Sequence, residues 1–261
     1  MHPEVEIFGR TVPTYGLMAA AGIVCGLLFV LFRARSLKLD VVNSIYMYTF
    51  GFIGAGVGAK ILYLLVSIDD VIRDFKYHGF IDTLIGYAQG GLVFYGGLIG
   101  AIGAAHLTAR YLKEDITLHY PALVPGIAIL AGFGRIGCFL AGCCYGARTD
   151  SHLCVVFPAG SQAPSGIPLV PIQLYEAAFE FIAVIVFFGL GFIGKLRPYL
   201  LYIYCASYAV LRFILEFWRG DQLRGIYGPF STSQWISIAV LLFVVVKGIV
   251  MPLCGKIKAW R

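Results

Sequence analysis

The amino-acid sequence predicts an all-α membrane protein with about seven transmembrane helices, and three observations lead to this fold class. Hydrophobic residues make up 59% of the 261 residues, charged residues make up 13%, and the mean hydropathy is +0.84. These values lie outside the usage of soluble domains. Apolar runs long enough to cross a bilayer recur along the chain. The amino terminus lacks the basic segment and the cleavage site of a secretory signal, so the first run is expected to remain as a helix.

The apolar runs follow one another with little room for a separate soluble domain. Residues 1–261 are therefore interpreted as a single polytopic membrane domain. In chain order, the runs that we expect to span the membrane are Thr14–Phe32, Val41–Ser67, Gly91–Leu112, His119–Leu140, Pro171–Ile193, Tyr199–Phe217 and Gln234–Leu253.

Basic residues are concentrated in alternate connections, which predicts the orientation of the chain. The positive-inside rule places the amino terminus outside and the carboxy terminus in the cytoplasm, and an odd number of spans agrees with this. The net charge of +6 then reports orientation, and no nucleic-acid partner is expected. The basic residues in question are Arg33, Arg35, Lys38, Arg110, Lys113, Lys195, Arg197, Lys256, Lys258 and Arg261.

Two connections are longer than a simple turn. Residues 68–90 repeat apolar side chains with a helical period, which predicts an interfacial helix or arm lying in the outer membrane interface. A folded loop that packs on the bundle explains the same pattern equally well. Residues 148–170 are rich in proline, glycine and serine, which predicts an external loop without regular structure.

Glycines recur at helical spacing on the second and third predicted spans. Small residues three or four positions apart let the backbones of two membrane helices approach closely. The simplest interpretation is therefore close packing rather than a catalytic role. The glycines are Gly51, Gly54, Gly58, Gly96, Gly100 and Gly103.

Ionisable and hydroxyl side chains within the spans collect at the ends that the predicted orientation places outside. A charge at the centre of a bilayer costs at least about 2.5–3.5 kcal/mol. Several that converge in one leaflet therefore predict a polar cavity open to the outer leaflet. The residues are Tyr15, Lys60, Tyr95, Arg135, Glu176, Glu180, Arg212 and Glu216.

Arg135 and Arg212 are the two candidates for binding an anion in this cavity. A planar guanidinium matches phosphate oxygens in a bidentate manner, and the anion that an outer leaflet supplies is a phospholipid head group. The alternative is that the charges neutralise one another, with Arg212 paired to Glu216 one turn away and Arg135 paired to Glu176 across helices.

The segment Gly132–Gly146 combines five glycines, three cysteines and Arg135 at the end of an apolar run. Its first six residues match G-x-G-x-x-G, but that dinucleotide motif requires a strand-helix-strand context that is absent from the predicted fold. Several interpretations of the cysteines stay open. They are a disulfide from Cys154 to Cys143 or Cys144, a metal site of Cys143, Cys144, His152 and Cys154 that lacks a usual ligand spacing, a nucleophilic Cys143 or Cys144, and small residues packing a tight corner.

The order of spans and motifs resembles the bacterial prolipoprotein diacylglyceryl transferase family along nearly the whole chain. Each motif is short, but their order on a bundle of this topology is specific. The segments that carry the resemblance are Tyr15–Met18, Gly96–Gly100, Gly134–Gly146, Pro171–Glu176 and Arg212–Phe217.

The resemblance implies a transferase of lipoprotein biosynthesis in the bacterial cytoplasmic (inner) membrane, multi-pass, with its active site toward the outer leaflet. Its partners would be phosphatidylglycerol and a prolipoprotein signal peptide with a lipobox cysteine. A diacylglyceryl group would pass from the lipid to the cysteine thiol, which forms a thioether and releases glycerol phosphate. No cofactor and no metal are expected.

The resemblance also implies roles for individual residues. Arg135 and Arg212 would stabilise charge on the leaving phosphate, with Glu176 and Glu216 orienting them. Glu176, Tyr95 and the leaving phosphate of the substrate itself are the candidates for taking the thiol proton. The catalytic set is thus Arg135, Arg212, Glu176 and Tyr95. The expected phospholipid-binding set is Tyr15, Arg135, Gly137, Cys138, Gly142, Cys143, Gly146, Arg212 and Glu216, in which the glycine N–H groups would approach the phosphate.

The chain departs from the family pattern at three kinds of position. Tyr95 stands where the family usually has histidine, Cys138 and Cys143 stand at the usual asparagine and glutamate positions, and Ala141 replaces a second asparagine. These departures leave two alternatives: a divergent member that transfers the lipid group to another acceptor, and a non-catalytic phospholipid-binding or translocating membrane protein. A thiol-redox protein is disfavoured because the sequence has no C-x-x-C pair.

Overall fold

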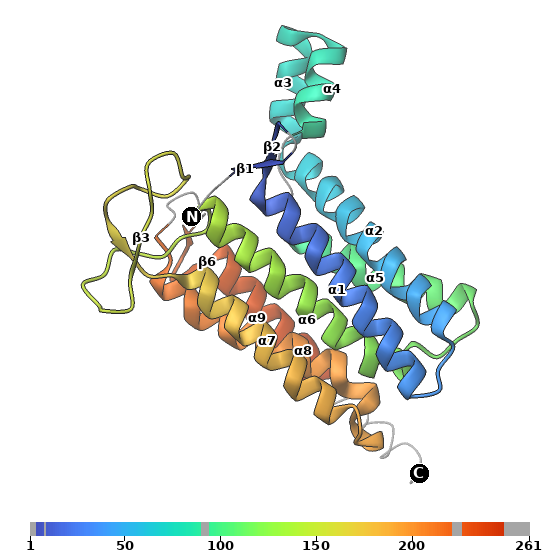
Figure 1. Ribbon diagram of the computed structural model, residues 1–261. Coiled ribbons are helices and arrows are strands. Elements are labelled where there is room, and N and C mark those ends of the chain that lie inside the picture. The colour runs from blue at the N-terminus through green and yellow to red at the C-terminus, as the bar shows by residue number, and fades with distance from the viewer. Residues whose placement is uncertain (1–3, 8, 90–93, 221–225, 248–261) are drawn as a thin grey trace. The chain divides into compact units, whose positions relative to one another are not determined.

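The computed structural model describes residues 4–7, 9–89, 94–220 and 226–247. The chain divides into two compact units, one formed by residues 30–119 and the other by residues 1–29 together with 120–261. Helices α1 (Thr14–Ser36) and α6 (Ile116–Ala141) each contribute to both units. The elements are labelled in Figure 1.

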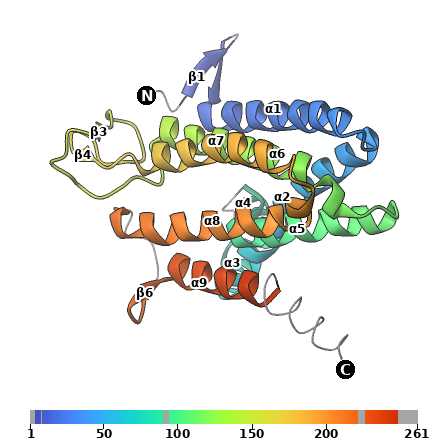
Figure 2. The same ribbon diagram turned by 90° about the horizontal axis from the view of Figure 1, so that it is seen from below.

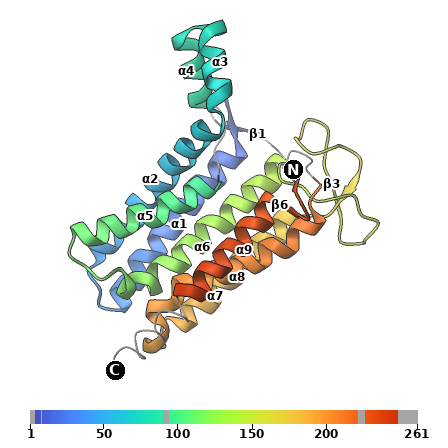
Figure 3. The ribbon, with the colours of Figure 1, turned by 180° about the vertical axis from the view of Figure 1, so that it is seen from behind.

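The unit of residues 30–119 is built on a tightly packed pair, α2 (Val41–Val66) and α5 (Phe94–Tyr111). Helix α2 begins where the Asp40 side chain accepts a hydrogen bond from the Asn43 N–H at 2.8 Å, which satisfies one of the unpaired donors of the first turn. The two helices lie side by side in Figure 3. A Cβ atom added at Gly58 would lie 3.0 Å from Gly100 Cα, so the glycines let the backbones meet, as the small-residue pattern predicted.

Helices α3 (Ile68–His78) and α4 (Phe80–Gln89) form a helical hairpin between α2 and α5. The chain turns at Gly79, whose φ of +80° lies in the region that glycine adopts most readily. The rings of Phe75 and Phe80 stack across this turn with centroids 5.5 Å apart. The segment 68–90 is thus two helices rather than one, and its placement in the membrane interface stays a prediction.

The other unit begins with the hairpin of β1 (Glu4–Ile7) and β2 (Arg10–Pro13), in which Val5 pairs with Val12. Parts of α1 and α6 belong to this unit, which continues with α7 (Ile172–Leu190), the 3₁₀ helix η1 (Gly194–Tyr199) and α8 (Leu200–Leu215). A second 3₁₀ turn, η2 (Glu216–Trp218), follows, and the short strands β5 (Ile226–Tyr227) and β6 (Phe230–Ser231) lead into α9 (Thr232–Val245). Figure 2 shows α8 beside α9.

The loop between α6 and α7 contains a small folded element. Strands β3 (Val155–Val156) and β4 (Pro168–Leu169) pair antiparallel, and Phe157, Ala163 and Leu169 form a buried apolar cluster beneath them. The expectation of an irregular external loop over 148–170 therefore misses two short strands. Each strand has two residues, which is too short to show an alternating pattern in the sequence.

Among the described residues, five helices are long and apolar enough to cross a membrane. This finding agrees with the expected all-α membrane class, whereas the count of seven and the orientation stay predictions. The predicted third run corresponds to α5 and the predicted seventh to α9, a shorter apolar helix. Residues 90–93 and 248–261, which include parts of these two runs, lie outside the described residues. The five helices are Thr14–Ser36, Val41–Val66, Ile116–Ala141, Ile172–Leu190 and Gly194–Trp218.

Candidate functional site

A fully buried carboxylate, Glu176, forms the centre of a polar site within the unit of residues 1–29 and 120–261. Glu176 lies on α7 and has 0% of its surface exposed. One oxygen, Oε2, lies 2.6 Å from Arg135 Nε on α6, and the other, Oε1, lies 3.6 Å from Arg212 Nη1 on α8. A single carboxylate therefore joins two guanidinium groups from two further helices.

Each arginine has additional polar partners. Arg135 Nη2 donates to the Tyr208 hydroxyl at 3.0 Å. Arg212 Nη2 lies 2.7 Å from Glu216 Oε2 and donates to Ser233 Oγ at 3.2 Å. Both pairings that the sequence left open, Arg135 with Glu176 and Arg212 with Glu216, are thus present.

The Arg212 guanidinium has one weakly engaged donor. Its Nη1 atom is buried and lies 3.6 Å from Glu176 Oε1, within ion-pair distance, but it makes no hydrogen bond to the described residues. A buried donor that makes no hydrogen bond costs about 1–3 kcal/mol. Such a donor is suited to a further acceptor, such as an anionic oxygen.

A second buried carboxylate, Glu180, lies one turn further along α7. Its Oε2 atom accepts a hydrogen bond from the Tyr204 hydroxyl at 2.9 Å. Tyr204, Tyr208 and Arg212 are four residues apart and share one face of α8. This stripe contains the partner tyrosines that sequence reasoning missed, and its i, i+4, i+8 spacing was the signal that pointed to them.

Helix α6 ends in a Schellman motif, which sets the geometry of the cysteine-rich corner. The Cys143 N–H donates to the Cys138 carbonyl at 3.0 Å, and the Gly142 N–H donates to the Phe139 carbonyl at 3.2 Å. Gly142 has a φ of +74°, the left-handed conformation that this motif requires. In a Schellman motif, a side chain in the last turn of the helix characteristically contacts the side chain two residues beyond the cap. In this protein these two residues are Cys138 and Cys143.

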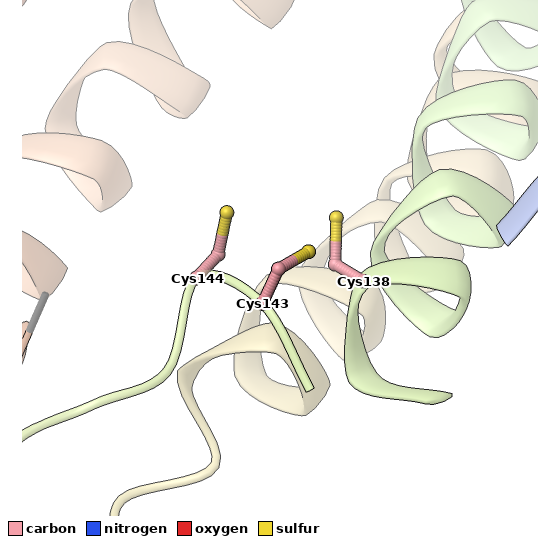
Figure 4. A group of neighbouring side chains, drawn as sticks. All are labelled: Cys138, Cys143 and Cys144. Atoms are coloured by element: carbon pink, nitrogen blue, oxygen red, sulfur yellow. The ribbon is translucent and has the colours of Figure 1, made fainter. Parts of the chain in front are cut away.

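Three thiols meet at this corner. The Sγ atoms of Cys138, Cys143 and Cys144 all lie within 4.8 Å of one another, and their arrangement is shown in Figure 4. Cys144 has a φ of +60°, which is uncommon for a residue with a Cβ atom and is typical of functional sites. The thiols that come together are those of Cys138, Cys143 and Cys144, whereas the metal site that the sequence left open comprised Cys143, Cys144, His152 and Cys154. Cys138, Cys143, Cys144 and Cys154 are all free thiols in the structure.

The two thiols beyond the end of α6 differ in acidity. Hydrogen bonds from Cys138 and Cys143 and the positive charges of Arg219 and Arg135 lower the pKa of Cys144, against the effect of burial. The pKa of Cys143 is raised to about 11. The hydrogen bond that Cys143 receives from Cys138 lowers this pKa, but the hydrogen bond that it donates to Cys144 and its burial raise it by more.

The predicted binding glycines are explained by close packing. The Gly142 N–H already donates within the helix cap, and the Gly146 N–H donates to the Val170 carbonyl at 3.1 Å. A Cβ atom at Gly137 would lie 3.1 Å from Tyr15 Cδ2 on α1, and one at Gly146 would lie 2.7 Å from Val170 Cβ. Tyr15 is thus adjacent to Gly137. The N–H groups of Gly142 and Gly146 are already occupied, so they are poor candidates for phosphate contacts.

Tyr95 lies near the start of α5, in the unit of residues 30–119, so its role stays a prediction. Residues that sequence reasoning missed include Gln173 on α7, whose Nε2 donates to the Cys143 carbonyl at 2.7 Å. Ser231 at the start of α9 donates through Oγ to Glu216 Oε1 at 2.8 Å. These neutral polar residues carry no distinctive signal in an apolar sequence.

Several helices long enough to cross a membrane, three of which bring Arg135, Glu176 and Arg212 together in ion pairs, define a multi-pass membrane protein. Comparison of the sequence with protein families assigns the chain to a narrower class. The family model described as prolipoprotein diacylglyceryl transferase matches residues 4–250. The chain belongs to this family.

Curated relatives from several bacteria match most of the chain. It is 37% identical over 256 residues to phosphatidylglycerol–prolipoprotein diacylglyceryl transferase 2 of Clostridium perfringens, covering 97% of this chain and 94% of the relative. It is 36% identical to the phosphatidylglycerol–prolipoprotein diacylglyceryl transferase of Clostridium tetani, covering 94% and 93% of the two chains. The transferase of that name from Geobacter sulfurreducens is 33% identical, with 87% and 86% covered.

Proposed function

We propose that this protein transfers a diacylglyceryl group from phosphatidylglycerol to the thiol of a lipobox cysteine in a prolipoprotein. A thioether forms and glycerol phosphate is released. The reaction takes place in the bacterial cytoplasmic membrane, at a site that opens toward the outer leaflet. Family membership supports the reaction class. The observation that carries the assignment to a site is the pairing of Arg135 and Arg212 with the same buried carboxylate, Glu176.

The role of the arginines follows from where charge develops. When the acceptor sulfur attacks the glyceryl carbon, the carbon–oxygen bond breaks and its electron pair leaves with the phosphate. Donors aimed at the leaving oxygen stabilise the transition state more than the ground state. The buried Nη1 donor of Arg212 lies 3.6 Å from Glu176 Oε1 and makes no hydrogen bond to the described residues. It is the group we assign to a phosphate oxygen, and Arg135 contributes the second guanidinium.

Glu176 and Glu216 act as positioning residues in this proposal. Each holds a guanidinium at ion-pair distance, 2.6 Å for Arg135 and 2.7 Å for Arg212. Buried guanidinium groups that are fixed in this way lose little freedom when phosphate binds. Two ion pairs on Glu176 favour an orienting role over that of a base. Tyr95 and Tyr15 are proposed to offer hydroxyl groups to the lipid.

Transfer by the purified protein tests the proposal directly. Labelled phosphatidylglycerol and a lipobox peptide are supplied, and label on the peptide cysteine is measured. Arg135→Lys and Arg212→Lys keep the charge but lose the planar fork. We expect each to reduce transfer at least about 100-fold, the scale for losing one transition-state donor. The control is Arg73→Ala, because Arg73 is an exposed residue of α3 paired with Asp70.

Two outcomes would contradict the proposal in different ways. Transfer that persists in both arginine variants would remove the role assigned to the two guanidinium groups. Release of glycerol phosphate by the wild type without label on the lipobox peptide would indicate a different acceptor. That second candidate is favoured by one observation, the presence of Cys138 and Cys143 at positions where the family usually has asparagine and glutamate.

A further inference from the structure

The corner formed by the three thiols lies one helical turn from the arginine site, both along α6 and along α7. Cys138 follows Arg135 by three residues on α6, and Gln173, which binds the Cys143 carbonyl, precedes Glu176 by three residues on α7. Three helical residues advance by about 4.5 Å. The thiols and the guanidinium groups therefore belong to one continuous polar region, close enough to act on the same reaction.

The sulfur positions fit a thiophilic cation. Zn–S bonds of about 2.3 Å in a tetrahedral site place the sulfurs about 3.8 Å apart. The Sγ atoms already lie within 4.8 Å of one another, so rotation of side chains brings them to that spacing without a change in the helix cap. Three protein ligands leave the fourth tetrahedral position open, which is the pattern of catalytic rather than structural zinc sites.

The surroundings of the corner favour a charged complex with a peptide ligand. Three thiolates and Zn²⁺ carry one net negative charge, and Arg135 lies within one helical turn of Cys138 on α6. The Gln173 side chain is fully buried, and its Oε1 atom has no donor among the described residues. An amide oxygen in this state is suited to accept a backbone N–H of an extended acceptor peptide.

We propose that Cys138, Cys143 and Cys144 bind Zn²⁺, and that the open fourth position binds the thiol of the acceptor cysteine. This inference rests on the proposed function, and it replaces the sequence-based expectation that the site holds no metal. It also identifies what activates the acceptor, because a thiol that coordinates a metal ion loses its proton. A separate protein base at the position of Tyr95 is then not required.

The step balances without a redox partner. On binding, the acceptor S–H loses its proton to water at the membrane surface and a Zn–S bond forms. The thiolate then attacks the glyceryl carbon, an S–C bond forms, and the C–O bond breaks with its electron pair leaving on the phosphate beside Arg135 and Arg212. The thioether product is uncharged and a weaker ligand than a thiolate, so it leaves the metal.

Metal content and transfer, measured on the same protein, test the inference. The full-length protein is purified under reducing conditions, and zinc is determined by mass spectrometry. We expect one zinc ion per chain in the wild type. Cys143→Ser and Cys144→Ser should lose it, whereas the matched control Cys154→Ser, a free thiol in the adjoining loop, should retain it. Titration of Co²⁺ into the metal-free wild type should produce thiolate-to-cobalt charge-transfer bands, a readout that needs no variant to fold.

Chelation separates the inference from the function on which it rests. Removing zinc should lower transfer to the lipobox peptide at least about 100-fold, the scale for loss of thiol activation, and adding Zn²⁺ should restore it. Full transfer by the metal-free protein, copper in place of zinc, or three thiols that bind neither zinc nor cobalt would each overturn the inference. A zinc-loaded protein that releases no glycerol phosphate and labels no peptide would overturn the proposed function, although the cysteine site would stand.

Discussion

Glu176 depends on its two arginines as much as they depend on it. A carboxylate with no exposed surface is stable as an anion only if cations and donors surround it. Arg135 at 2.6 Å and Arg212 at 3.6 Å provide that surrounding. In return, Glu176 allows the guanidinium groups of the buried Arg212 and the partly buried Arg135 to remain within an apolar bundle. The site is a mutually dependent set rather than a collection of independent contacts.

Replacing Glu176 with glutamine tests this dependence. The amide keeps the shape but leaves the buried Arg212 and the partly buried Arg135 with less neutralising charge. We therefore expect a loss of about 3–5 kcal/mol in the free energy of unfolding. Thermal unfolding in detergent measures it. Glu114→Gln is the control, because the Glu114 side chain is 32% exposed where it meets His119, and it should cost much less. Equal destabilisation by the two variants would contradict the central role of Glu176.

At the scale of elements, the end of α6 determines where the thiols lie. The Schellman motif places Cys138 and Cys143 together through backbone hydrogen bonds alone, and the left-handed conformation at Cys144 completes the corner. The backbone requirement for glycine at Gly142 therefore also affects where the Cys144 thiol lies. The same cap fixes the start of the loop that contains β3 and β4.

Alanine at Gly142 should disrupt this cap. Gly142 has a φ of +74°, and a Cβ atom there would lie 2.7 Å from Ser161 Cβ. Gly160 is a matched control, since its φ is +89° but nothing lies within 4 Å of an added Cβ atom. Gly160→Ala should cost about 1–2 kcal/mol for backbone strain alone, and Gly142→Ala should cost more. Alkylation of Cys143 by a maleimide, followed over time, should accelerate in Gly142→Ala only. Equal alkylation rates in both variants would show that the cap does not hold the thiols.

The packing of α2 against α5 depends on glycine for the absence of a side chain rather than for a left-handed backbone. Alanine at Gly100 would press its Cβ atom to 3.0 Å from both Gly54 C and Gly58 Cα, backbone atoms that cannot rotate away. We expect a loss of about 1–3 kcal/mol in the free energy of unfolding, the usual cost of overpacking. Gly103→Ala on the same helix meets nothing within 4 Å, so it should be neutral or stabilising by helix propensity. Unfolding curves that coincide for the two variants would contradict close packing at Gly100.

At the scale of the whole molecule, the distribution of basic residues predicts that the amino terminus lies outside and the carboxy terminus in the cytoplasm. An epitope inserted at Gly160 should be accessible to protease in spheroplasts, and an epitope inserted at Lys113 should be accessible only in inverted vesicles. Gly160 is exposed and has no close neighbours, so the insertion should leave the fold intact. The opposite pattern of cleavage would reverse the orientation and place the arginine site toward the inner leaflet.

The residues of the candidate site divide by how much the sequence reveals about them. Arg135, Glu176, Arg212 and Glu216 were predictable because a charge within an apolar run is costly and needs a reason. Tyr208 was missed although its spacing of four residues from Arg212 pointed to it. Gln173 was not predictable, because neutral polar side chains occur in membrane helices for many reasons. The cysteines were visible, but the sequence left their role open among a disulfide, a metal site, a nucleophile and close packing, since spacing along the chain does not show how a helix cap turns.

The sequence by itself determined the all-α membrane class and the charged residues within the apolar runs, because hydropathy, periodicity and charge are local properties of the chain. Only the tertiary structure decided that Glu176 is shared between Arg135 and Arg212, and that the thiols of Cys138, Cys143 and Cys144 meet. Both arrangements depend on where separate helices and a left-handed turn place their side chains in space. Contacts between residues distant in the chain follow from packing, which no single segment of sequence specifies.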